Sequence, residues 1–183
     1  MKPPFTLTNT MLNDMVEISS LVGQLQVQHG RNLALRRESR IRSIQSSLAI
    51  ENNSLSLEQV TAILDGKRVL GPPDDIQEVK NAYDAYEKIL AYDPFSVNDF
   101  LKAHELLTQG LVGQSGRFRS KDVGIYNSQG EVIHVGARPQ FVSGLVTDLF
   151  KWAKTDETPL LIKSAVVHYE IEMIHPFEDG NGR

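Results

Sequence analysis

The sequence predicts an all-α domain with a single β-hairpin on its surface. Apolar residues recur mostly at intervals of three and four, which is the helical period. Helix caps and Gly or Pro breaks divide the chain into helical segments, and only one stretch has the composition of paired strands. With 183 residues, of which 40% are hydrophobic, the chain has the size of one globular domain with a substantial core.

Two apolar stripes mark the N-terminal helices, and the first helix is expected to end near Gly30. Stripes at this spacing are typical of helix faces that pack into a core, not of ligand sites. The first stripe consists of Met11, Met15, Ile18, Val22 and Leu25. The second consists of Leu33, Ile41, Ile44 and Leu48.

The next helices are located by caps and breaks. Ser56 followed by Gln59 has the pattern of a capping box, which predicts a short helix that stops at Gly66. The Gly-Pro-Pro sequence at 71–73 breaks the chain before a further helical pattern over 76–90.

Residues 122–135 carry the strand signal. Two short β-prone runs, at 122–126 and 131–135, flank a four-residue loop at 127–130, which is typical of a hairpin. One hairpin cannot build a sheet core in a helical chain, so we expect it to lie on the surface of the helices.

Three helices are predicted in the second half of the chain. Ser96, with Asp99 at the reciprocal capping position, indicates the start of the first. The second runs through 141–152, and the third has Pro159 in its first turn and leads to His175. His104 and His168 lie within helical patterns and are expected to be packed or hydrogen-bonded structural residues.

Composition excludes several classes of function. A formal charge of −4 and a pI near 5.7 provide no excess of basic residues to neutralise a phosphate backbone, so nucleic acid is not expected as a partner. The absence of cysteine excludes disulfides and a thiolate nucleophile. No signal peptide or transmembrane-length run is found, and a cytoplasmic protein without a membrane partner is expected.

The last nine residues, HPFEDGNGR, concentrate chemistry that suits a nucleotide. Pro176 cannot extend the preceding helix, and Phe177 is the apolar anchor expected to pin the turn to the core. This leaves His175 and Asp179 facing outward. His175, with an unperturbed pKa near 6.5, can accept the proton of an attacking hydroxyl at neutral pH.

The rest of this ending is suited to phosphate. Gly180 and Gly182 allow the backbone to approach a ligand and to form an anion nest, and Asn181 and Arg183 can donate hydrogen bonds to phosphate oxygens. Asp179 offers one carboxylate to Mg²⁺, which takes its other ligands from water and phosphate. Taken singly, these elements are also found in helix caps, turns and Ca²⁺ loops, although the EF-hand spacing is missing.

HPFEDGNGR resembles the signature of the Fic family, HxFx(D/E)GNGRxxR. The resemblance extends upstream, where Gly-Arg-Phe-Arg at 116–119, Val123, His134, Pro139 and Trp152 are similar to the family's flap region. It implies a Fic-type helical domain with a hairpin flap, in which Ile133, His134 and Val135 dock the target by main-chain hydrogen bonds.

The resemblance also implies an activity. A Fic enzyme is a nucleotidyltransferase, here a protein adenylyltransferase (AMPylator), with ATP as substrate and Mg²⁺ as cofactor. Catalysis would fall to His175, metal binding to Asp179, and AMP would pass to a Ser, Thr or Tyr hydroxyl of a protein, the chain itself included. The nucleotide-binding residues implied are Phe177, Asp179, Gly180, Asn181, Gly182 and Arg183.

Residues 47–52 resemble the family's inhibitory helix pattern, (S/T)xxxE(G/N), at Ser47, Glu51 and Asn52. The resemblance implies autoinhibition, with Glu51 reaching into the γ-phosphate region. The alternative is an ordinary helix end, stopped by Asn52 and Asn53.

The predicted organisation is an N-terminal helical region, residues 1–95, followed by a Fic core, residues 96–183. The second arginine of the family motif would fall beyond Arg183, so the core is expected to be C-terminally incomplete. Removal of AMP, transfer of UMP, phosphocholine or phosphate by the same site, and a non-catalytic binding module all stay open as alternatives. A homodimer also stays open.

Overall fold

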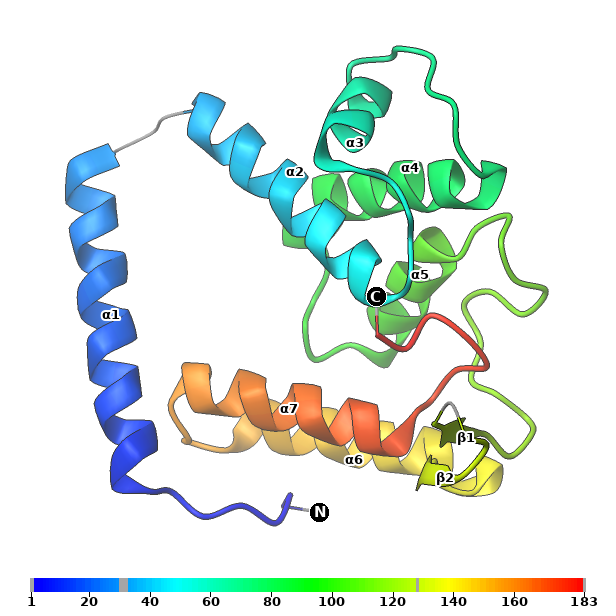
Figure 1. Cartoon of the computed structure of the whole chain (residues 1–183). Coiled ribbons are helices and arrows are strands. Elements are labelled where there is room, and N and C mark those ends of the chain that lie inside the picture. The colour runs from blue at the N-terminus through cyan, green and yellow to red at the C-terminus, as the bar shows by residue number, and fades with distance from the viewer. Residues whose placement is uncertain (1, 30–32, 128, 183) are drawn as a thin grey trace.

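The computed structural model describes residues 2–29, 33–127 and 129–182. These ranges contain seven α-helices and one small hairpin, arranged as in Figure 1, which confirms the predicted all-α class. The elements in chain order are α1 (Asn9–His29), α2 (Leu33–Ile50), α3 (Leu57–Leu64), α4 (Pro73–Lys88), the 3₁₀ turn η1 (Ile89–Ala91), α5 (Val97–Leu107), β1 (Gly124–Tyr126), β2 (Val132–Val135), α6 (Pro139–Thr155) and α7 (Leu160–Ile174). Gly30, Ser128, Arg183 and the side chain of Leu33 lie outside the described residues.

Local sequence signals account for several helix starts. At α3, the Ser56 hydroxyl accepts from the Gln59 N–H (3.2 Å) and the Gln59 side chain accepts from the Ser56 N–H (2.9 Å), so the predicted capping box is confirmed. At α5, Ser96 caps as expected, but the Asp99 carboxylate accepts from the Asp93 N–H (3.1 Å) and not from Ser96.

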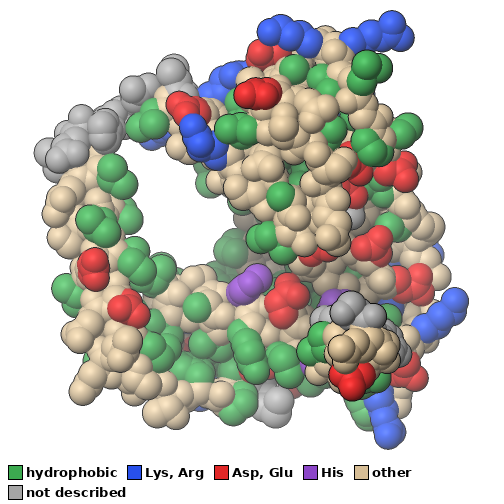
Figure 2. All heavy atoms as spheres, viewed as in Figure 1, with side chains coloured by type: hydrophobic (Ala, Val, Ile, Leu, Met, Phe, Trp, Pro, Cys, Tyr) green, Lys and Arg blue, Asp and Glu red, His purple; other side chains and the backbone are tan. Residues whose placement is uncertain are grey.

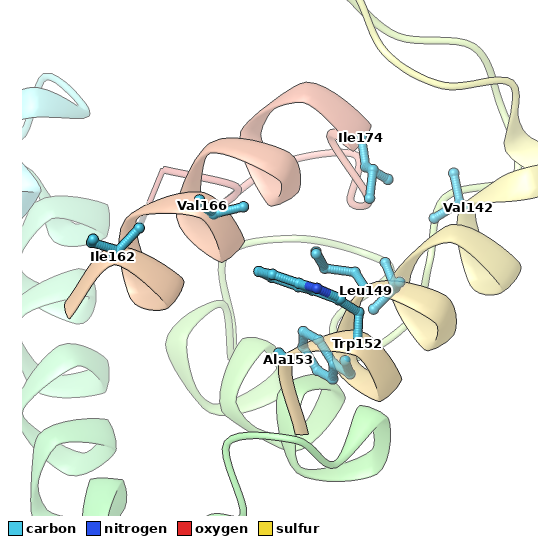
Figure 3. Close-up of a cluster of buried hydrophobic side chains, with 9 residues drawn as sticks. Val142, Leu149, Trp152, Ala153, Ile162, Val166 and Ile174 are labelled. Carbon is cyan, nitrogen blue, oxygen red and sulfur yellow. The ribbon is translucent and has the colours of Figure 1, made fainter. Parts of the chain in front are cut away.

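The helices pack around two hydrophobic clusters. The N-terminal cluster joins α2, α3 and α4 and contains Ile41, Ile44, Leu48, Leu55, Val60, Val79 and Ala82. The C-terminal cluster lies between α6 and α7 (Figure 3) and contains Val142, Val146, Leu149, Phe150, Trp152, Ala153, Ile162, Val166 and Ile174. Helix α5 lies between the two, because Leu107 packs against the first cluster and Phe100 against the second.

Helix α1 departs from its predicted role. Met11 and Met15 pack against the C-terminal cluster as expected, but Ile18, Val22 and Leu25 are 44%, 47% and 55% exposed, so the prediction of one continuous core face is wrong. The reason is the path of the helix, which leaves α7 after its first turns and stands apart from the body (Figure 1). Figure 2 shows an opening between α1 and the body, with hydrophobic side chains along it.

The residues before α1 cross the predicted boundary at 95/96. Phe5 lies edge-on against Trp152 of α6, with ring centroids 5.9 Å apart, so the N-terminal segment packs on the C-terminal cluster. The division at 95/96 stays a prediction. His168 is exposed on α7, so the expectation that it packs is wrong. None of the helices in the described part of the chain is long and apolar enough to cross a membrane.

The hairpin lies on the surface, as predicted, and joins the end of α7. β1 and β2 pair antiparallel with Gly124 opposite Val135, and the register is irregular between Ile125 and Tyr126. The Asn127 N–H donates to the Glu131 carbonyl (2.9 Å), which closes the predicted loop. His134 Nε2 lies 2.9 Å from the Met173 carbonyl oxygen, and this contact attaches β2 to α7.

Candidate active site

The site begins where α7 ends. His175 has left-handed backbone geometry, with φ 52°, and its N–H still donates to the Ile171 carbonyl (2.8 Å). A non-glycine residue in this conformation costs about 1–2 kcal/mol, so neighbouring contacts must hold it there. Pro176 follows and cannot continue the helix, which confirms the predicted turn.

Arg119 provides much of this support. Its side chain is only 2% exposed, and its guanidinium donates to the carbonyls of His175 (2.6 Å), Ile174 (3.2 Å) and Lys121 (2.7 Å), and to that of Ala137. Its backbone N–H also donates to the Pro176 carbonyl (3.0 Å). Two of these acceptors lie at the C-terminal end of α7, where the helix dipole favours a cation. Burial lowers the pKa of Arg119.

The His175 imidazole is partly buried, and burial lowers its pKa below 6.5, although the nearby Glu172 carboxylate partly offsets this. Its Nδ1 is buried and makes no hydrogen bond of good geometry to any described residue. The neutral imidazole is therefore the dominant form at pH 7, which is the form that can accept a proton.

Phe177 anchors the loop, as predicted. The side chain is 2% exposed and packs among Phe100 (centroids 5.1 Å apart), Phe118 (5.8 Å) and His104 (3.7 Å). Asn181 closes the loop over it: the Asn181 amide accepts from the Phe177 N–H (2.9 Å) and donates to the Phe177 carbonyl (3.0 Å). The second hydrogen of the Asn181 NH₂ group takes no part in this pairing.

Gly180 cannot be replaced without moving the loop. Its φ is +76°, and an added Cβ would lie 2.8 Å from the methyl group of Thr108, the C-cap residue of α5. Asp179, one residue earlier, is exposed, and one of its carboxylate oxygens accepts from the Gly180 N–H (2.6 Å).

For a metal ion, this loop provides the carboxylate of Asp179 as a ligand. The described residues contain no group of three or more acidic, His or Cys side chains that could hold an ion. Asp179 is exposed beside the glycine-rich turn, so it fits a Mg²⁺ ion that takes its remaining ligands from nucleotide phosphates and water.

The C-terminal end of α2 meets this loop. The Asn53 N–H donates to the Leu48 carbonyl (3.0 Å) and the Asn52 N–H to the Ala49 carbonyl (3.1 Å), and Asn52 is left-handed with φ 68°. This pattern is a Schellman motif, in which Glu51 is the C-cap residue directly after the last helical residue, Ile50. An added Cβ at Gly182 would overlap Glu51 Oε1 and lie 3.0 Å from Glu51 Cδ, so the carboxylate rests against Gly182.

The comparisons with known proteins match this geometry. A sequence model of the Fic/DOC family matches residues 94–183, which contain α5, the hairpin, α6, α7 and the loop after α7. A crystal structure of a Fic family protein from Desulfovibrio desulfuricans superposes on the whole chain with a TM-score of 0.94 and 47% identity, and 57% of that chain is covered. The chain belongs to the Fic/DOC family.

Other Fic proteins show a weaker likeness. A structure of Fic-1 from Caenorhabditis elegans aligns with 94% of this chain and 56% of its own, with a TM-score of 0.68 and 25% identity. The curated protein adenylyltransferase fic-1 of the same species is 31% identical over 172 residues, which cover 86% of this chain and 32% of that protein. Protein adenylyltransferase Fic from Aedes aegypti is likewise 31% identical over 171 residues. This chain thus spans about a third of the length of the curated relatives it matches.

The Fic fold gathers most of the sequence-predicted site residues. His175, Asp179 and Gly180 follow one another around the anchored loop, and Glu51 reaches Gly182 from the N-terminal helices. The residue directly after the predicted flap also packs against His175: an added Cβ at Gly136 would lie 3.2 Å from His175 Cβ. Arg183 lies outside the described residues.

Some residues have other surroundings than their predicted roles imply. The Ser47 hydroxyl donates to the Ile44 carbonyl (3.0 Å) within α2. The ring of Phe177 is buried and its main-chain groups pair with Asn181, so its part in the site is to fix the loop. Sequence reasoning assigned no role to Arg119; the signal was its place in the Gly-Arg-Phe-Arg segment.

Proposed function

We propose that this Fic domain transfers AMP from ATP to a Ser, Thr or Tyr hydroxyl of a protein. The observation that supports it best is the partly buried His175, whose backbone carbonyl accepts a hydrogen bond from Arg119 at the start of a preformed glycine-rich loop. The relatives named protein adenylyltransferase support the same reaction.

His175 takes the proton of the target hydroxyl while that oxygen attacks the α-phosphorus of ATP. A new O–P bond forms, the bond to the β-phosphate bridging oxygen breaks, and pyrophosphate leaves. The backbone of Gly180 to Gly182, the remaining Asn181 N–H and Arg183 bind the phosphates and stabilise the charge that develops on them. Asp179 would hold Mg²⁺, and the ion would neutralise part of the phosphate charge.

The flap is proposed to hold the target segment as an added strand along β2. Ile133 and Val135 are 66% and 62% exposed, so this strand is accessible to a partner. Main-chain pairing tolerates many target sequences. A pocket of about 280 Å³ beside it is lined by His134, Val135 and Met173 among others, and it is suited to one target side chain.

Glu51 is proposed to keep the basal activity low. Its carboxylate rests against Gly182, where phosphate oxygens would approach the loop, and two negative charges at such a distance repel each other. ATP would then bind in an unproductive position. A protein target, self-modification, a homodimer and the cytoplasmic location stay predictions.

The test uses the full-length protein with Mg²⁺ and ATP labelled at the α- or the γ-phosphate. Glu51→Gly is expected to raise α-label on protein about tenfold or more over wild type, which corresponds to roughly 1.4 kcal/mol of relieved inhibition. Adding His175→Ala should abolish the label. Glu38→Gly, on an exposed part of α2, is the matched control and should leave the basal level unchanged.

The outcomes separate the alternatives. Label from the γ position indicates a kinase, and no label in any variant indicates a binding module; either result contradicts adenylyl transfer. Loss of existing AMP from a labelled protein in the Glu51→Gly variant indicates removal of AMP. If Glu51→Gly equals wild type while both carry α-label, Glu51 is only a helix end.

A further inference from the structure

His104 on α5 contacts the catalytic loop from outside the motif. The side chain is only 4% exposed. Its Nδ1 accepts a hydrogen bond from the Gly116 N–H (3.0 Å). The proton of the neutral ring must therefore be on Nε2, which lies 3.0 Å from the Asp179 carbonyl oxygen and donates to it.

The same ring also supports the anchor of the loop. It stacks on Phe177 with centroids 3.7 Å apart and an interplanar angle of 6°. Phe177 and Asp179 flank Glu178, which is exposed, so the His104 side chain contacts the loop on both sides of that residue. An added Cβ at Gly180 would be 3.5 Å from His104 Nε2, so the loop packs closely on the imidazole.

The residues that contact His104 are themselves held in place. Gly116, whose N–H sets the tautomer, has φ +70°, and an added Cβ there would lie 2.8 Å from Glu105 Cβ. The Thr108 hydroxyl bonds to the His104 carbonyl (2.7 Å) and to the Ser115 hydroxyl (2.6 Å), which ties the segment after α5 back onto the helix. A side chain held this way keeps its donor aimed at one point.

We propose that His104 is a positioning residue of this Fic domain, which holds the Asp179 carbonyl and the Phe177 ring so that the Asp179 carboxylate and the Gly180–Gly182 backbone meet the phosphates of ATP. The proposal rests on the adenylyl transfer proposed above. It gives α5 a function in nucleotide binding, although His104 itself touches no substrate.

The competing explanation is that His104 only stabilises the segment between α5 and the flap through Gly116. Two substitutions separate these roles, because each retains one hydrogen bond. In His104→Gln the side-chain NH₂ takes the place of Nε2–H and can still donate to Asp179. In His104→Asn the side-chain oxygen takes the place of Nδ1 and can still accept from Gly116, but the shorter side chain does not reach Asp179.

The experiment compares both variants in the full-length Glu51→Gly protein. For His104→Asn, kcat/KM for ATP is expected to fall about tenfold, the size expected when a part-buried carbonyl loses its donor. His104→Gln is expected to stay within about threefold of the parent. His168→Asn, on the exposed surface of α7, is the matched control and should be unaffected.

A second readout does not depend on activity. Hydrogen exchange of the amides at 177–182 should be faster in His104→Asn than in His104→Gln. The proposal is overturned if the two variants exchange and react alike, or if His104→Gln is the more damaged. If the parent transfers no AMP, the proposed function fails, and the exchange comparison still decides whether His104 holds the loop.

Discussion

The lowered pKa of His175 gives the site a pH profile with a definite sign. A general base works when it is deprotonated, so the acid limb of kcat/KM should have its midpoint below 6.5. Because the unfolded chain binds this proton more readily than the folded one, stability should also fall as the pH drops through this range.

A substitution at Glu172 tests the cause of this shift. The Glu172 carboxylate raises the pKa of His175 against the larger effect of burial, so Glu172→Gln should move the midpoint further down. The measurement is kcat/KM against pH in the Glu51→Gly background, with Glu157→Gln as an exposed control. A midpoint at or above 6.5, or an upward move in Glu172→Gln, would contradict this account.

At the same scale, the sequence predicted the residues of the loop better than those that hold it. Phe177 was expected to be the anchor because an apolar residue after a proline turn has few other places to go. Arg119 and His104 donate to backbone carbonyls 55 and 75 positions away. Every residue has a backbone carbonyl, so the sequence does not indicate which ones accept these hydrogen bonds. The left-handed conformation of His175 is supported by one of these distant donors, Arg119, so it could not be predicted from the sequence either.

At the scale of the element, the end of α2 fits both interpretations of residues 47–52 that the sequence left open, an ordinary helix end and an inhibitory pattern. Asn52 ends the helix in a left-handed conformation, which favours Gly or Asn, and the same turn places Glu51 against Gly182. The helix end and the contact through which Glu51 is proposed to inhibit are therefore made by one turn. The G/N position of the pattern follows from its backbone geometry.

Two substitutions at Asn52 separate backbone geometry from side-chain chemistry, because the Asn52 side chain is exposed. Asn52→Gly should retain both stability and low basal AMP transfer. Asn52→Ala should cost about 1 kcal/mol, or roughly 2–4 °C in Tm, because Ala is strained in this conformation. It should also raise basal transfer by loosening Glu51. Equal Tm values and equal basal labelling in the two variants would refute this.

Helices were predicted well where local signals decide them and poorly where a distant partner does. The capping box at Ser56 involves neighbours in sequence and was read correctly. The stripe on α1 had the helical period, but periodicity does not say whether anything packs against it. Ile18, Val22 and Leu25 are exposed because no described segment covers that part of α1.

At the scale of the whole molecule, the N-terminal segment connects parts that the sequence assigned to different regions. Phe5 packs against Trp152 and the rest of the C-terminal cluster, so the residues before α1 stabilise the helix pair that carries His175. Phe5→Ala should therefore lower the free energy of unfolding by about 2 kcal/mol, less than for a fully buried Phe.

Leu7→Ala is the matched control, because Leu7 is 48% exposed. Thermal unfolding should show a drop of roughly 4–8 °C for Phe5→Ala and a much smaller one for Leu7→Ala. If the two variants unfold at the same temperature, the N-terminal segment contributes nothing to the core.

The hydrogen bonds from Arg119 and His104 to loop carbonyls also limit what can be transplanted. Moving HPFEDGNGR onto the end of a helix in another scaffold would transfer every side chain of the motif, Asn181 included, but neither of these two donors, which lie outside the motif. Such a chimera should bind nucleotide weakly until an arginine and a histidine are supplied from two other elements. The portable unit is the loop together with α5 and the strand-bearing segment after it.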